Sequence, residues 1–190
     1  MSSQPSGSDA SLERVSAEAL ARAEEMIELE EGATNRLAGR LAGFVTVVAV
    51  AMSVFHLYTA YAIVRPEHLR AIHLAFVLFL SFLIFPVARK YRDRVMWWDW
   101  LLAGGALAVT LWRIAGGDDF FDRSILPEDP DIVFGVLMMA LILEAMRRST
   151  GWIMPVITLC FLGYAFFGPW LPAPWTHKGY ELPRIVGHMY

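Results

Sequence analysis

A short basic connector, residues 88–96, constrains this chain most, because it separates two long apolar runs and leads directly into three tryptophans. Its charged side chains are four bases and one acid: Arg89, Lys90, Arg92, Arg94 and Asp93. Short basic loops of membrane proteins are retained in the cytoplasm, and tryptophans concentrate at the bilayer interface. A soluble helical hairpin with a basic turn is the alternative, but the flanking runs are too long and too apolar for it. The connector therefore predicts a membrane protein with this turn in the cytoplasm.

Composition agrees with a membrane protein that carries a polar extension. Hydrophobic residues make up 56% of the 190 residues and charged residues 18%, below the roughly 25% of average soluble domains. Residues 1–35 hold eight acids and two bases, a net charge of −6 against −3 for the whole chain. We expect them to form an acidic cytoplasmic extension with one helix at about 11–31. The charge pattern argues against nucleic-acid binding, and the single Cys160 excludes a disulfide within the chain.

The remaining apolar runs predict an all-α, polytopic membrane protein with about five transmembrane helices and a cytoplasmic N-terminus. A helix needs roughly 20 apolar residues to cross the hydrocarbon core. The expected spans are 41–64, 69–88, 97–115, 132–146 and 152–167, within a membrane domain at 36–170. The loop before the fourth span is acidic, and Asp131 is placed to cap the helix that follows. Residues 171–190 are expected to form a periplasmic tail.

Two histidines are expected at similar depth on adjacent spans, His56 on the first and His73 on the second. Polar groups at membrane depth are costly and are therefore candidates for function. One interpretation is a haem-binding redox anchor with both histidines as axial ligands. The other is a hydrogen bond between the two helices, which contributes about 0.6 kcal/mol on average in such proteins.

Charged residues near the span ends predict ion pairs rather than catalysis. Asp99 lies among the tryptophans, where we expect a role at the helix start or an ion pair with Arg94. Glu144 precedes Arg147 and Arg148 by three and four residues, a spacing that places all three on one helix face. The chain has no recognisable catalytic triad, phosphate loop or metal motif, so we expect no enzyme activity and no cofactor in this chain.

Small residues predict where helices approach one another closely. Gly104 and Gly105 in the third span and Gly135 in the fourth are the candidates, because a glycine lets a neighbouring backbone come near.

Six segments, taken in order, resemble the fused permeases of TRAP transporters of the TAXI type. They are 55–60 (FHLYTA), 70–76 (RAIHLAF), 97–101 (WWDWL), 143–151 (LEAMRRSTG), Pro155 with 161–165 (FLGYA), and 177–190, which begins HKGY. Each segment is short, so it is their common order over about 41–190 that makes the resemblance specific.

The resemblance implies the small membrane component of a secondary transporter in the bacterial inner membrane. Its expected partners are a large permease component, a periplasmic TAXI-type substrate-binding protein and the lipid bilayer. In this family, the small component braces the large one, which holds the substrate and ion sites, with sodium as the typical coupling ion. The large domain would begin where this chain ends, at Tyr190, so none of the family's substrate-site residues maps onto this sequence.

Overall fold

Within the part of the chain that the computed structural model describes, residues 17–20, 22–23, 26, 33–117, 120 and 127–189, every regular element is helical. The elements are α2 (Gly39–Tyr61), α3 (Pro66–Ile84), η1 (Arg89–Tyr91), α4 (Trp97–Ala115), α6 (Asp129–Thr150), α7 (Ile153–Phe167), η2 (Gly168–Trp170) and α8 (Leu182–Met189). The expected all-α fold is confirmed. Of the acidic extension, residues 17–20, 22–23 and 26 are helical, and the rest of the helix expected at 11–31 lies outside the described residues.

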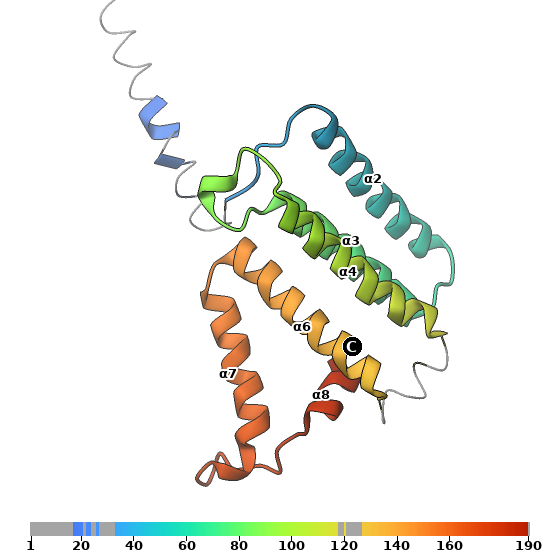
Figure 1. The fold of residues 1–190 in the computed structure, drawn as a ribbon, viewed down its shortest axis with the longest axis vertical. Coiled ribbons are helices and arrows are strands. Elements are labelled where there is room, and N and C mark those ends of the chain that lie inside the picture. The colour runs from blue at the N-terminus through green and yellow to red at the C-terminus, as the bar shows by residue number, and fades with distance from the viewer. Residues whose placement is uncertain are drawn as a thin grey trace, which may run out of the picture.

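The helices α2, α3, α4 and α6 form a bundle (Figure 1). We call the end where the connector joins α3 to α4 the connector end, and the opposite end, where residues 62–65 join α2 to α3, the loop end. In Figure 1, α7 turns away from the bundle beyond the connector end of α6, and α8 returns to lie beside α6. Contacts between helices agree, since α6 packs on α3, α4, α7 and α8, whereas α2 packs on α3.

Prolines set the ends of α3. The helix begins at Pro66, which suits a first helical position because its missing N–H has no partner there in any case. It ends at Ile84 because Pro86 forces the preceding residue, Phe85, out of the helical region, to φ −100° and ψ 114°. The expected span at 69–88 therefore ends four residues too late, because the run of apolar residues continues past Pro86 although the helix does not.

The helix α6 is longer than the expected span at 132–146. It starts at Asp129, with Pro130 in its first turn, and runs to Thr150 before Gly151 adopts a positive φ of 74°. Its last turn therefore includes Arg147 and Arg148. Arg147 and Arg148 are therefore helical residues of α6, and not part of the turn that follows it.

Small alanines allow α4 to lie close to its neighbours. Ala103 and Ala106 are fully buried, and they pack with Phe82 of α3 and Met138 of α6. The glycines expected to do this are not in close contact, since a Cβ built at Gly104 or its neighbour would meet no atom within 4 Å. The prediction chose the right helix but the wrong residues, because the contacting face depends on how α4 is rotated. The third candidate, Gly135 in α6, is buried.

Three described helices are long and apolar enough to cross a membrane: Gly39–Tyr61, Pro66–Ile84 and Ile153–Trp170, which is α7 extended through η2. The first and last are covered very little by the rest of the chain. Val45 is the only buried residue in α2, and Pro155 is the only one in α7. Apolar side chains on nearly all sides of a helix are typical of contact with lipid or with another membrane segment.

Candidate functional site

Asp99 lies at the third position of α4 and is almost completely buried, with 1% of its surface exposed. One carboxylate oxygen accepts a hydrogen bond from the backbone N–H of Met96 at 2.9 Å, which caps the helix. The other accepts from Nη1 of Arg148 at 2.6 Å. The negative charge is further stabilised by the helix N-terminus. Asp99 therefore joins the start of α4 to the end of α6.

Arg148 is the centre of a buried network, with 1% of its side chain exposed. Besides Asp99, it donates from Nε to Glu144 at 2.8 Å and from Nη1 to the carbonyl oxygen of Phe85 at 3.2 Å. Its guanidinium also lies over the ring of Phe82, 5.2 Å from the centroid. One side chain thus contacts α3, the residue after α3, α4 and α6.

Glu144 is shared by both arginines, as its spacing predicts. Arg147 donates to its two carboxylate oxygens at 2.7 and 2.8 Å, a bidentate geometry. Arg147 also lies over the ring of Trp152 at the start of α7, 5.5 Å from the centroid. Two acids and two bases make the network neutral, which suits its burial. The interpretation of Asp99 as a helix-start and ion-pair residue agrees with the structure, but its partner is Arg148 and not Arg94, which is exposed.

A second aspartate repeats this arrangement at the loop end. Asp131 is the third residue of α6, 2% exposed, and one of its oxygens accepts from the backbone N–H of Glu128 at 3.3 Å. The other accepts from the indole N–H of Trp112, near the end of α4, at 3.1 Å. The indole also stacks on Phe134, with centroids 4.9 Å apart. Each helix of the α4–α6 pair therefore begins with a buried aspartate bonded to the last turns of the other.

The two histidines meet directly between α2 and α3. Nε2 of His56 lies 2.9 Å from Nδ1 of His73, and Nδ1 of His56 lies 2.7 Å from the carbonyl oxygen of Met52. A carbonyl only accepts, so Nδ1 of His56 is the donor to Met52; in the neutral ring, Nε2 then accepts from His73. The interhelical hydrogen bond expected as one of the two interpretations is present.

This geometry does not fit a haem held by both histidines. Each axial nitrogen lies about 2 Å from the metal, so the pair would be separated by roughly 4 Å, with a flat macrocycle between them. Here the nitrogens are 2.9 Å apart and the ring planes are nearly perpendicular, at 84°. Among the described residues, no cluster of three or more His, Cys, Asp or Glu could hold a metal ion.

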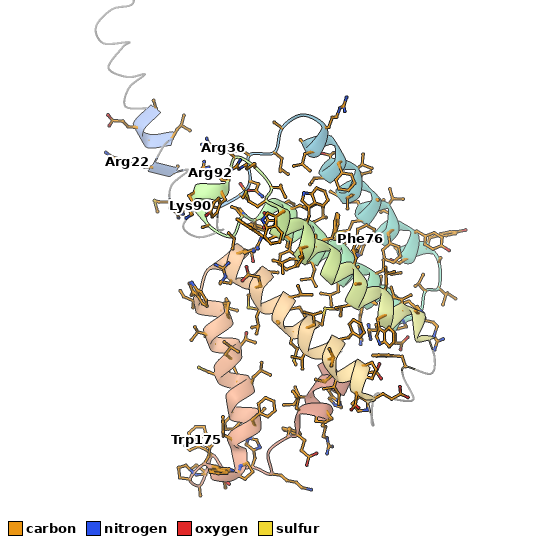
Figure 2. All side chains as sticks on the ribbon, viewed as in Figure 1. Arg22, Arg36, Phe76, Lys90, Arg92 and Trp175 are labelled. Atoms are coloured by element: carbon orange, nitrogen blue, oxygen red, sulfur yellow. The ribbon has the colours of Figure 1, made fainter. Side chains whose placement is uncertain are left out.

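Hydroxyl groups inside the described helices mostly bond within their own helix; the hydroxyl of Thr158 in α7 also lies 3.8 Å from Sδ of Met146 in α6. Among the described residues, six donate to the carbonyl oxygen four residues earlier: Thr46, Ser53, Thr110, Ser149, Thr150 and Thr158. Thr110 also lines an apolar cavity of about 360 Å³ between α2, α3 and α4, whose wall includes Phe76 (Figure 2). The other residues that line the cavity are apolar, and the Thr110 hydroxyl is already bonded to carbonyl oxygens of α4.

Comparison with protein-family models finds no matching family, and comparison with curated proteins and with solved structures finds no match either. The site is therefore interpreted from its own geometry. Sequence reasoning missed Trp112 as a partner of Asp131 and missed the long-range pair of Asp99. A usable signal was present, because both helices carry aspartate at the same third position.

We expect Arg148→Gln to lower the free energy of unfolding by about 3–5 kcal/mol, because it leaves the Asp99 carboxylate buried without its charged partner. Thermal or denaturant unfolding of the purified protein in detergent measures the loss. Arg22→Gln is the matched control, since the pair of Arg22 with Glu18 is 4.0 Å long and its side chains are 80% and 72% exposed; it should cost less than about 1 kcal/mol. Equal losses for the two variants would contradict the central role of Arg148.

We expect Trp112→Phe to cost about 1.5–3 kcal/mol, because the ring stack on Phe134 is kept while the hydrogen bond to the Asp131 carboxylate is lost. The same unfolding measurement applies. In the double variant with Asp131→Asn, the costs should be clearly non-additive, since both substitutions remove one interaction. Additive costs would show that the two side chains act independently.

Proposed function

We propose that this chain is the small membrane component of a TRAP-type secondary transporter. In that role it acts as a scaffold for ion-gradient-driven uptake of a small organic solute delivered by a periplasmic binding protein. The proposal rests on the ordered sequence segments that resemble TAXI-type permeases and on one structural observation. That observation is a set of helices fixed rigidly to one another by buried polar contacts, with apolar surfaces turned outward.

The geometry favours a scaffold over a conducting or catalytic unit. The buried charges at the connector end form a neutral, closed set in which Asp99, Glu144, Arg147 and Arg148 satisfy one another. A proton or ion path would instead need polar groups strung through the middle of the helices. Conversely, α2 and α7 leave most of their apolar surface uncovered, and a large permease component is a suitable partner for such surfaces.

We further propose five crossings, by α2, α3, α4, α6 and α7, with the connector end in the cytoplasm of a bacterial cell and the tail in the periplasm. Three basic segments that are distant in the sequence support this orientation, because they meet at one end of the bundle. Residue 36 bonds to the connector through its N–H and the carbonyl oxygen of Arg92, at 2.7 Å. Arg148 reaches the same end through Asp99. Positive charge gathered at one end is typical of the cytoplasmic side.

The topology predicts the location of each loop. A reporter that is active only in the cytoplasm should be active when fused after Arg94 and inactive when fused at residue 126, because an odd number of crossings separates the two sites. Activity assays on whole cells measure this directly. The reverse pattern would overturn the orientation, and equal activity at both sites would overturn the crossing by α4.

The scaffold role predicts assembly with a large permease component. Tagged chain should co-purify with that component, and Glu144→Gln should reduce the amount recovered per tagged chain. The physical reason is that Glu144 holds both arginines of α6 in place, and with them the angle at which α7 leaves. Glu67→Gln is the matched control, since the ion pair of Glu67 with Arg65 is 4.0 Å long and lies at the loop end. Equal recovery with both variants would refute this role of Glu144, and recovery of no large component with the unaltered chain would refute the scaffold proposal.

A further inference from the structure

The connector end carries a second group of basic residues that the buried network does not use. It consists of Arg36, Arg40, Arg89, Lys90, Arg92 and Arg94, with Asp93 as the only acid among them. Arg36 pairs with Asp93 at 3.9 Å, but their side chains are 68% and 77% exposed. Figure 2 shows Arg36 near Lys90 and Arg92 of the connector. We call these six bases and Asp93 the basic patch; it has a net charge of +5.

The chain preceding the bundle is fixed to this patch at its point of exit. The backbone N–H of Asn35 donates to the carbonyl oxygen of Ile84 at 2.6 Å, and its side-chain amide donates to that of Leu83 at 2.7 Å. Asn35 is buried, with 9% of its surface exposed. The next residue bonds to the connector through the carbonyl oxygen of Arg92. Along the chain, the sequence before Ala33 is therefore only a few residues from a point that is fixed beside the patch.

Those upstream residues carry the opposite charge at high density. The acidic segment, defined here as residues 24–31, holds five glutamates: Glu24, Glu25, Glu28, Glu30 and Glu31. Glu18, farther upstream, is exposed and pairs with Arg22. A chain spans at most about 3.6 Å per residue, so Glu31 cannot lie more than roughly 14 Å along the chain from Asn35. A partner tethered this closely has an effective concentration in the millimolar range.

We propose that the acidic segment of this chain docks on its own basic patch. The short tether and the opposite charges favour this occupant over a separate molecule, which lacks the tether and its high effective concentration. Single exposed ion pairs contribute little, but several bases facing several acids form a network whose attraction is collective and sensitive to salt. Docking neutralises the patch, so it controls whether an anionic lipid headgroup or an acidic partner can reach the connector. The inference does not depend on the transporter proposal.

Zero-length carbodiimide coupling of a carboxylate to an amine tests this contact. The only two lysines are Lys90, in the patch, and Lys178, in the tail. In purified full-length chain held in uncharged detergent, we expect Lys90 to be joined to glutamates of the acidic segment within a single chain, as identified by mass spectrometry. The yield should fall several-fold between about 0.1 M and 1 M salt, where the Debye length shrinks from about 10 to 3 Å.

Matched variants distinguish the effect of positive charge from that of the lysine amine that the coupling requires. Lys90→Arg keeps the charge and should abolish the product, whereas Arg89→Gln with Arg94→Gln keeps the amine and should lower the yield several-fold. Arg184→Gln, in the tail, should leave the yield unchanged. Coupling of Lys178 to Glu181, which line a common cavity of about 700 Å³, reports that the reagent works.

Three results would overturn the proposal. The first is absence of the Lys90 product while Lys178 couples normally. The second is a product formed between differently labelled chains, which would assign the patch to a second copy. The third is loss of the product in bilayer discs that contain anionic lipid, which would assign the patch to lipid headgroups.

Discussion

The hydrogen-bonded ion pair between Arg148 and Asp99 is the interaction on which the bundle depends most. It is buried at the point where α3 ends, α4 begins and α6 ends, and it satisfies a helix N-terminus, a free carbonyl and two carboxylates together. Burying a guanidinium and a carboxylate costs several kcal/mol each unless their partners are complete. The network meets that requirement only when all three helices are in place, so its formation couples their positions.

The pair at the loop end shows the same physical solution with a neutral donor. Both helices of the α4–α6 pair use one oxygen of an aspartate to cap themselves and the other to bind the opposite helix. An antiparallel pair fixed at both ends in this way resists sliding and rotation. Such rigidity suits a component whose role is to brace another, and it leaves the outward surfaces of α2 and α7 for contact with lipid and with a partner.

Positive charges at the connector end fall into two groups with different physical roles. Arg147 and Arg148 form ion pairs within a neutral network, and Arg148 has almost no exposed surface. Apart from Arg92, which is half-buried, the bases of the patch are exposed, and their field extends over a Debye length of about 8 Å at physiological salt. Only the second group is therefore accessible to an anionic partner, whether a segment of the same chain or a lipid headgroup.

The sequence by itself determined the features that depend on local geometry. These include the helical class, the placement of Glu144 beside both arginines and the capping role of Asp131, because spacings of three and four residues fix neighbours on one helix. The end of α3 at Ile84 also follows from a local signal, Pro86, although that proline lies inside an apolar run.

Only the tertiary structure decided which partner each buried aspartate receives. Asp99 and Arg148 are 49 residues apart, and the nearer Arg94 was an equally plausible partner by charge alone. The outcome depends on where the end of α6 lies against α4. That position is set by the packing of Ala103 and Ala106 in a shared core, and no short-range pattern in the sequence records it.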